Sequence, residues 1–396
     1  MTCSRESTPS MSDLPPANPT LDIYRVGGAI RDEFLGRPRA DLDFVVLRCS
    51  DQDFCLAFPG AKRVGRGHGA VYYVRGAEFT LSAAPDIQSD LATRDLTINA
   101  LAQNQHGDLF ALDQTWDDLK SKVLRQVEDD NFFQDPVRIF RAARLAADLP
   151  DFTVARELEA LLIRVGQTRA LNGLAPERVG QEVLKACAAP NPGRFLRILD
   201  QTETLSPWLR ELARAGSIPA GPGHVHEHSL LEHTARVMDL LAGNPLQVWM
   251  GLCHDLGKTL TPEADLPHHF GHDRAGARLA ETLGGRLRLP KAYQKAGHTA
   301  ARWHMVAGQY DRLRPGTRVD LLMNLKTRPK VQDLFSLVKA DQGADHLSQA
   351  VVDLQIVGSV KLPQDHMGLG PRSGALLRNL QAQALAHSSF ASGKAG

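Results

Sequence analysis

The chain has 396 residues, 23% of them charged, and a formal net charge of +1. This length predicts two or three domains, each large enough to bury a hydrophobic core. The near-zero net charge excludes a protein that is basic throughout, so any nucleic-acid surface has to be local and built from clustered arginines.

Cysteine usage and apolar segments bear on the compartment. The cysteines are scattered, odd in number and without metal-binding spacing, which predicts a reducing compartment and no disulfide framework. They are Cys3, Cys49, Cys55, Cys187 and Cys253. No apolar run reaches the length that spans a bilayer. We therefore expect a cytoplasmic protein without membrane contacts, with a disordered leader rich in Ser, Pro and Thr over residues 1–20.

Strand and helix patterns mix over residues 21–115, and helical spacing takes over from about residue 135. Strands are predicted over residues 23–26, 42–47, 71–74 and 78–81, with a hairpin turn at residues 75–77. Pro176 is well placed in the first turn of a helix. Residues 216–223, rich in Gly, Pro and Ser, are predicted to form a linker, and the tail after about Ser373 is predicted to fray.

The segment after the first predicted strand combines two glycines with two aspartates. Gly27 and Gly28 precede a helix, whose N-terminal N–H groups bind phosphate well. Because side chains alternate along a strand, Asp41 and Asp43 share one face and their apolar neighbours point to the other. Two carboxylates this close favour a cation, and Mg²⁺ prefers oxygen ligands. A phosphate cradle beside such a pair indicates nucleotidyl transfer.

An arginine ridge follows on a helix that begins near Pro136. Arg138, Arg141 and Arg144 lie on one side of this helix, and its apolar residues lie on the other. Such a ridge suits a triphosphate or an RNA backbone because each guanidinium can bind phosphate bidentately. An exposed basic helix face without a ligand is the alternative. Asp135 and Arg138 carry complementary hydrogen-bonding edges that can read a base.

Histidines are dense over residues 224–272. We single out His233, His254, Asp255 and Asp341, because imidazole and carboxylate groups together suit a divalent transition metal. Other polar residues of this part could bind phosphate or shuttle protons, namely Lys258, His269, His272 and His304. For His224, His226 and His228 we expect structural or surface roles.

Taken together, these motifs resemble the class II tRNA nucleotidyltransferase and poly(A) polymerase family, in its bacterial form with a C-terminal HD domain. The matching elements occur in the family's order, and residues 174–179 with the His254-Asp255 region extend the match to about residue 345. The first elements are residues 26–32, 41–43, 94–100 and 135–138. The resemblance implies an enzyme that adds nucleotides to the 3′ end of tRNA without a template.

The resemblance also implies an α+β fold and a division into domains. A nucleotidyltransferase palm with a small mixed sheet is expected over residues 21–145, followed by an all-helical neck and body over 146–215. An all-helical HD domain over 220–350 and a helical tail over 351–396 complete the chain.

Site roles follow from the same resemblance. Asp41 and Asp43 would hold Mg²⁺, and Gly28 and Arg31 would contact the phosphates of the incoming nucleotide. Arg94, Arg141 and Arg144 would line the nucleotide pocket, and Asp135 and Arg138 would select the base. Glu78 is a weaker candidate for a third acidic group. In the HD domain, His233, His254, Asp255 and Asp341 would bind a divalent metal for hydrolysis of phosphomonoesters or 2′,3′-cyclic phosphates.

Two departures from the family's pattern bear on which nucleotides are added. Gln134 replaces the family's Glu beside Asp135, which could tune nucleotide choice. Between Glu78 and Arg94 the chain lacks the extended, basic, glycine-rich loop of full CCA-adding relatives. The resemblance therefore favours an enzyme that adds CC from CTP and leaves the final A to a separate enzyme.

Three alternatives stay open at this point. The enzyme could add the complete CCA from CTP and ATP. The HD hydrolase could be the main activity, with the N-terminal part as an RNA-binding module. Poly(A) polymerase ranks lowest, because it typically has a strongly basic C-terminal extension and no HD domain.

Overall fold

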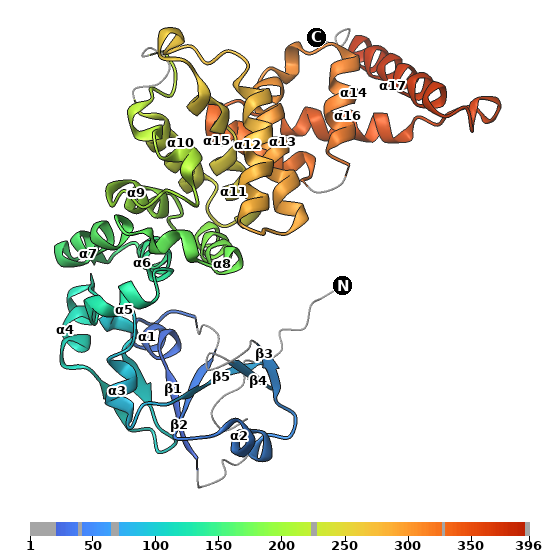
Figure 1. Ribbon diagram of the computed structural model, residues 1–396. Helices are drawn as coiled ribbons and strands as arrows, with labels where there is room; N and C mark the ends of the chain where they lie inside the picture. The colour runs from blue at the N-terminus through green and yellow to red at the C-terminus, as the bar shows by residue number, and fades with distance from the viewer. Residues whose placement is uncertain (1–20, 39–41, 65–70, 223–227, 327–328, 393–396) are drawn as a thin grey trace. The chain divides into compact units, whose positions relative to one another are not determined.

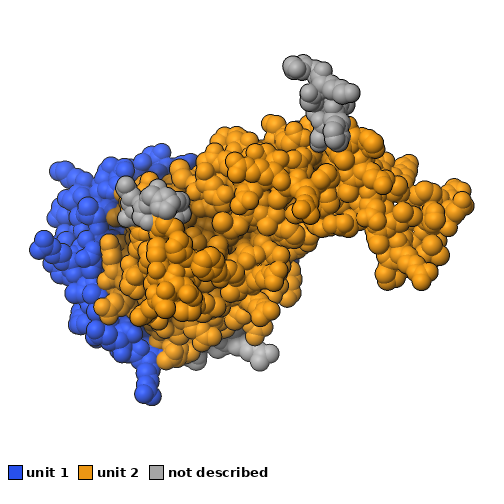
Figure 2. Space-filling view, turned by 90° about the horizontal axis from the view of Figure 1, so that it is seen from above, with its two compact units in different colours: residues 1–142, 151–170 blue, residues 143–150, 171–396 orange. Residues whose placement is uncertain are grey.

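The computed structural model describes residues 21–38, 42–64, 71–222, 228–326 and 329–392 (Figure 1). The chain forms two compact units, which Figure 2 colours separately. The first comprises residues 1–142 and 151–170, and the second comprises residues 143–150 and 171–396. The domain boundaries expected near residues 145 and 215–220 stay predictions. In the part of the chain that the structure describes, every helix is too short or too polar to traverse a lipid bilayer.

The first unit is built on a seven-stranded sheet in the order β3-β4-β5-β2-β1-β6-β7. Only β2 and β5 pair in parallel among these strands, and each of the other neighbouring pairs is antiparallel. The strands are β1 (Asp22–Val26), β2 (Asp43–Leu47), β3 (Lys62–Val64), β4 (Val71–Val74), β5 (Ala77–Ser82), β6 (Leu101–Gln103) and β7 (Leu109–Ala111). The predicted strands and the β4–β5 hairpin are confirmed.

Helices pack on both faces of this sheet. The helices of the unit are α1 (Gly28–Phe34), α2 (Asp51–Ala57), α3 (Ile87–Leu91), α4 (Asp113–Ser121), α5 (Asp129–Gln134) and α7 (Arg156–Gly166). Phe44 and Val46 of β2 share a core with Phe54 of α2. Val45 and Leu47 point to the opposite face and share a second core with α3. The period-two alternation expected of this strand is therefore present.

The second unit is all-helical where the structure describes it, apart from an isolated bridge between Pro219 and Ser229. Helix α6 (Arg138–Asp148) runs from the first unit into it. Its helices are α8 (Pro176–Cys187), α9 (Gly193–Gln201), α10 (Leu230–Leu240), α11 (Pro245–Cys253), α12 (His272–Arg286), α13 (Lys291–Ala307), α14 (Pro315–Asn324), α15 (Val331–Gln342), α16 (Leu347–Ser359) and α17 (Pro371–Ser392). The helix predicted to start at Pro176 is confirmed.

Two expectations for this unit are wrong. Residues 216–222 are not a free linker, because Ile218 and Ala220 are buried and their backbones bond to the start of α10 and to His228. The tail does not fray directly after Ser373, since it continues as α17, which packs on α14 and α16 and buries Gln381 and Leu385. In both segments, apolar side chains among the small residues find a core, and local composition does not reveal this.

The turn between β1 and α1 depends on one backbone conformation. Gly27 has φ 74° and ψ −133°, and its N–H donates to the carbonyl of Leu101 at 3.0 Å. Side chains with a Cβ avoid this region of φ and ψ. The glycine therefore allows the chain to leave the sheet and enter α1 within one residue.

We predict that Gly27→Ala destabilises the protein by about 1–3 kcal/mol, the usual cost of a strained residue. Urea unfolding followed by circular dichroism measures the change. Gly60→Ala is the matched control, because Gly60 has no positive φ and a Cβ there meets no atom within 4 Å. Equal stability of the two variants would contradict the strain argument.

Candidate nucleotide and metal sites

The ends of three neighbouring strands bring the first candidate residues together. Val26 pairs with Asp43 across β1 and β2, and Asp43 pairs with Glu78 across β2 and β5. Residues in register on neighbouring strands point to the same face, so the two carboxylates are adjacent. Glu78 also accepts a hydrogen bond from the hydroxyl of Tyr73 at 2.9 Å. The position agrees with a third acidic group, which stays a prediction, and Asp41 lies outside the described residues.

Arg31 is fixed at the start of this site by two buried partners. Its Nε donates to Asp32 Oδ1 at 2.9 Å and its Nη1 donates to Asn99 Oδ1 at 2.6 Å. All three residues are buried. Asn99 belongs to the 94–100 motif, so these contacts join two motifs that are about 70 residues apart in sequence. No role for Asn99 follows from the sequence pattern alone.

Asp95 is the centre of the network. Its Oδ1 accepts from Asn99 Nδ2 at 3.1 Å and from the N–H of Leu96 at 2.8 Å, and its Oδ2 pairs with Arg141 Nε. Burial alone would raise the pKa of this carboxyl, but Arg141, these hydrogen bonds and Arg138 outweigh it and lower the pKa well below the usual range. Asp95 is therefore ionised and holds the arginine helix against the 94–100 motif.

Arg138 also interacts electrostatically with the carboxylate of Asp95. Its Nε lies 4.0 Å from Asp135 Oδ2, and its buried Nη1 has no hydrogen-bond partner among the described residues. Burial lowers the pKa of Arg138, and Asp95 and Asp135 oppose that shift. A buried guanidinium nitrogen without a partner is costly unless a ligand supplies an acceptor. The geometry therefore fits the expected role of Arg138 and Asp135 at a base edge.

Two predicted pocket arginines have protein partners. Arg94 donates to Asp90 Oδ2 through Nε and Nη2, at 3.2 and 2.6 Å. Arg144 lies in the second unit and its Nε donates to Glu182 of α8 at 2.9 Å. The apolar side of α6 is confirmed, because Ile139, Phe140 and Ala143 are fully buried. Of the arginines of α6, Arg141 thus pairs with Asp95 in the first unit and Arg144 pairs with Glu182 in the second.

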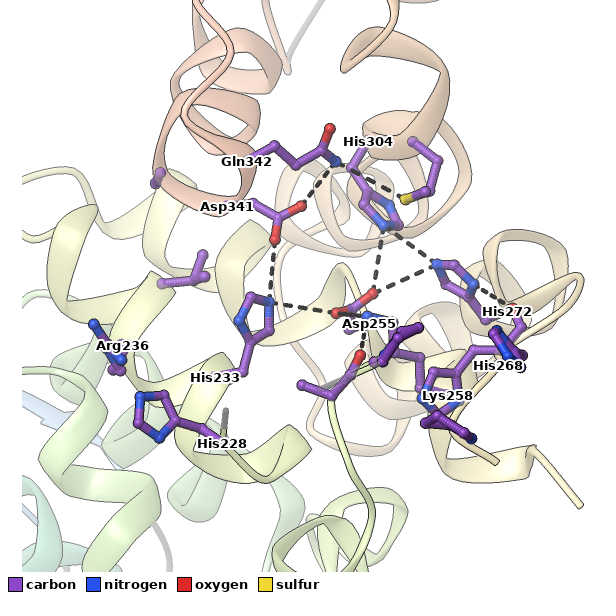
Figure 3. Close-up of a pocket in the computed structure, with 18 of the residues that line it drawn as sticks. His228, His233, Arg236, Asp255, Lys258, His268, His272, His304, Asp341 and Gln342 are labelled. Atoms are coloured by element: carbon purple, nitrogen blue, oxygen red, sulfur yellow. Dashed lines mark hydrogen bonds and ion pairs between the residues drawn. The ribbon is translucent and has the colours of Figure 1, made fainter. Parts of the chain in front are cut away.

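The second candidate site lies in the second unit, where helices α10, α11 and α15 meet the turn at Asp255 (Figure 3). His233 comes from α10, His254 from the C-terminal end of α11, and Asp341 from α15. Asp255 directly precedes the short helix η7 (Leu256–Leu260). Their ligand atoms all lie within 4.8 Å of one another, as predicted for a metal site.

Distances within this group are short. His233 Nε2 lies 3.2 Å from His254 Nε2 and 3.1 Å from Asp341 Oδ1, and His254 Nε2 lies 3.1 Å from Asp255 Oδ2. The Nδ1 atom of His254 lies 2.7 Å from the carbonyl of Gly251, which can only accept. That Nδ1 must therefore carry a proton, and in the neutral ring the lone pair of Nε2 faces the site.

The donor set fits a divalent cation. Burial would lower the pKa of His254, but Asp255 and Asp341 outweigh it and raise this pKa to about 10. The same imidazole helps to lower the pKa of both carboxyls well below the usual range, against the effect of burial. Two buried carboxylates facing imidazole nitrogens require either protons or a metal ion between them. Nitrogen and oxygen ligands of this kind suit a transition metal.

His272 and His304 face the other oxygen of Asp255. Their Nε2 atoms lie 3.5 and 3.4 Å from Oδ1, an atom that is buried without a hydrogen-bond partner among the described residues. With Asp255 they form a second group whose ligand atoms lie within 4.8 Å of one another. Burial lowers the pKa of His272. Both rings also have Nδ1 against backbone carbonyls, so Nε2 again points into the site.

Lys258 and His269 make hydrogen bonds that fix the backbone segments around the site. Lys258 Nζ lies 2.7 Å from Asp255 Oδ2 and donates to the carbonyl of Ala220 at 2.7 Å. Both ring nitrogens of His269 are occupied, by Thr261 Oγ1 at 2.7 Å and by the carbonyl of Pro219 at 2.9 Å. The expectation that His269 binds phosphate or shuttles protons is therefore wrong, because its ring has no nitrogen left for a ligand.

Close backbone packing sets the position of Asp255 relative to α12. A Cβ on Gly257 would lie 2.0 Å from the carbonyl oxygen of His272. The glycine in the His-Asp-x-Gly sequence thus permits η7 to approach the start of α12. His228 is exposed and lines the cavity over this site, so its structural or surface role stays a prediction, and His224 and His226 lie outside the described residues.

We predict that Asp95→Asn destabilises the protein by about 1.5–3 kcal/mol, the range for a hydrogen bond to a charged group. The loss stays below that of a fully buried ion pair because the Arg141 side chain is 43% exposed and can reach water. Since the folded-state pKa of Asp95 is lowered, its contribution is present above the unfolded pKa of about 3.9 and is lost as pH falls.

Urea unfolding at pH 7 and at successively lower pH tests this, with the exposed Asp117→Asn as control. The difference between wild type and Asp95→Asn should shrink below about pH 4. If the difference in unfolding free energy between wild type and Asp95→Asn stays constant at every acidic pH, Asp95 is not ionised in the folded protein.

Comparison with known proteins places the chain in a family. No family model matches it. It is 35% identical over 341 residues to the multifunctional CCA protein of Halorhodospira halophila, covering 80% of this chain and 81% of that protein.

Two solved structures share the fold at lower identity. The Thermotoga maritima CCA-adding enzyme complexed with tRNA has a TM-score of 0.61 and 18% identity, over 93% of this chain and 91% of that one. The Bacillus stearothermophilus CCA-adding enzyme in complex with CTP has a TM-score of 0.59 and 20% identity, over 95% of each chain. Together with the curated relative, they confirm the expected α+β fold. The chain belongs to the class II tRNA nucleotidyltransferase family and is an enzyme.

Proposed function

We propose that this enzyme adds CMP residues from CTP to the 3′ end of tRNA and releases pyrophosphate. The substrate classes follow from its relatives, one of which is named as a CCA protein and two of which were solved with tRNA or with CTP. We assign transfer to residues 21–145, tRNA binding to residues 146–215 and a separate hydrolytic site to residues 220–350.

In this proposal Asp43, with Asp41, holds Mg²⁺, which when bound activates the RNA 3′-hydroxyl and neutralises charge on the leaving pyrophosphate. The 3′-hydroxyl oxygen loses its proton to solvent and bonds to the α-phosphorus of CTP, while the bond from that phosphorus to the oxygen bridging to the β-phosphate breaks and pyrophosphate leaves. Arg31, held by Asp32 and Asn99, binds the nucleotide's phosphates. Arg138 offers its buried, unpartnered nitrogen to the base.

One observation favours addition of CC alone. Strand β5 ends at Ser82 and α3 begins at Ile87, so only residues 83–86 connect them. Hydrogen bonds fix both ends of this connection. Ser82 Oγ accepts from the N–H of Ala84 at 3.3 Å, and Asp86 Oδ1 caps α3 by accepting from the N–H of Ser89 at 2.8 Å.

A connection this short cannot reshape the nucleotide pocket so that it binds ATP in place of CTP. In the family that the chain resembles, a long flexible loop at this place provides that change. We infer that this enzyme stops after CC, in which case a separate activity must add the final A. Its relatives are named as a CCA protein and a CCA-adding enzyme, and complete CCA addition from CTP and ATP is the alternative.

The deciding experiment gives the purified enzyme a tRNA that ends at its discriminator base. CTP alone, ATP alone or both are supplied, and the products are sequenced. We expect products ending in CC with CTP, the same products with both nucleotides, and no extension with ATP alone. A product ending in CCA would refute the CC-only proposal and leave the nucleotidyltransferase assignment intact.

A second activity is favoured by the buried histidine and aspartate cluster. We propose that it holds a divalent transition metal through His233, His254, Asp255 and Asp341, whose ligand atoms all lie within 4.8 Å of one another. A metal at this place supplies a Lewis acid for hydrolysis of phosphate esters, including 2′,3′-cyclic phosphates. Lys258 holds Asp255 in position from the other side.

We predict that the two activities separate by mutation. Asp341→Asn keeps the size of the side chain but removes a charged ligand, so it should lower metal content and phosphohydrolase activity at least tenfold and leave CMP transfer unchanged. Asp43→Asn should do the opposite. Elemental analysis, hydrolysis of cytidine 2′,3′-cyclic phosphate and tRNA extension provide the readouts, and thermal melting confirms folding.

Retention of full CMP transfer by Asp43→Asn would refute its metal role. Unchanged metal content in Asp341→Asn would likewise refute the proposed ligand set.

A further inference from the structure

The cavity over the histidine cluster is much larger than a phosphate group. It measures ≈ 880 Å³ and is lined by residues of η7, α10, α13 and α15, and by the segment before α12. Cavities of about 300–1,000 Å³ accommodate whole small molecules. The lining beyond the cluster therefore has room for the part of a substrate that carries the phosphate.

One side chain of this lining is exposed to a degree that folding does not explain. Phe270 is 85% exposed, more than any other large apolar side chain that the structure describes, and it lines the cavity. The ring of His268, which also lines the cavity, stacks beside it at 5.9 Å and an interplanar angle of 21°. The two rings add aromatic surface to a cavity lining that also contains the polar side chains of the cluster.

The backbone on both sides of Phe270 is held in place. His269 is anchored through both ring nitrogens, to Thr261 and to the carbonyl of Pro219. Gly271 takes the left-handed conformation, with φ 70°, immediately before α12. The carbonyl of His269 then accepts from Nδ1 of His272 at 2.7 Å. Phe270 is therefore presented by a fixed loop, which reduces the entropy cost of binding.

We propose that Phe270, with His268 beside it, is a stacking platform that recognises the base of a nucleotide substrate at the hydrolytic site. This inference rests on the phosphohydrolase function proposed above. Phe270 is two residues from His272, so their Cα atoms are at most about 7 Å apart, comparable with the span from base to phosphate in a nucleotide. Every base has a π-face, so the platform tolerates different bases and favours the larger purines.

The test is a binding titration of the full-length, metal-loaded protein by calorimetry. Adenosine 2′-monophosphate and base-free glycerol 2-phosphate are compared, with saturating CTP present to fill the transfer site. We expect Phe270→Ala to weaken binding of adenosine 2′-monophosphate about tenfold relative to glycerol 2-phosphate, a typical loss for one stacked base. Phe270→Tyr should restore the wild-type ratio. Leu260→Ala, another exposed apolar residue but one outside the cavity lining, should leave the ratio unchanged.

Turnover separates the platform from the proposed activity. Adenosine 2′,3′-cyclic phosphate and glycerol 1,2-cyclic phosphate carry the same five-membered ester ring, and water opens it by attack at phosphorus with loss of one P–O bond. If Phe270 is a stacking platform, Phe270→Ala should raise KM for the adenosine ester relative to KM for the glycerol ester. The kcat for the adenosine ester should be largely unchanged.

Hydrolysis of neither ester by the wild type would refute the phosphohydrolase function, and the titration would still decide the platform. Equal binding of adenosine 2′-monophosphate by wild type and Phe270→Ala would overturn the platform.

Discussion

The buried charge of Asp95 organises part of the first unit. A carboxylate removed from water is stable only when positive charge and donors surround it, and here these come from Arg141, Asn99 and a backbone N–H. Asn99 in turn fixes Arg31 beside the glycine turn. One buried charge thus sets the relative positions of motifs that are far apart in sequence.

Sequence reasoning captured the strands, the two-faced arginine helix and the histidines and aspartates that the structure brings together. These features depend on local periodicity and on residue types with few alternative uses, such as the apolar alternation around Phe44. It failed where tertiary packing decided the outcome. The expected helical tail packs after Ser373 where fraying was predicted, and the segment around Ile218 also finds a core that composition does not reveal. The partners of Asp95 could not be foreseen, because a motif gives residue types without their directions.

Histidines illustrate the same limit at the second site. His269 and His272 are three residues apart in sequence, and either could serve as a ligand by its residue type. In the structure, both ring nitrogens of His269 bond to Thr261 and Pro219, whereas His272 faces Asp255. Only the position of each ring nitrogen separates the two roles. The exposure of Phe270 likewise becomes informative only when its flanking residues are seen to be anchored. An exposed phenylalanine in a sequence is otherwise unremarkable.

The two sites bury negative charge by different means, and this difference supports a structural role for Asp95 and the metal site proposed at the cluster. Asp95 meets guanidinium groups, which are always charged, so its charge is balanced within the protein. Asp255 and Asp341 meet mainly imidazoles, and the Nε2 atom of His254 turns towards them because its Nδ1 proton is committed to a backbone carbonyl. Lys258 balances one carboxylate oxygen, but Oδ1 of Asp255 has no hydrogen-bond partner in the part of the chain that the structure describes. Carboxylates facing imidazole nitrogens in this way need protons or a metal ion between them, which is the physical basis for proposing a metal there.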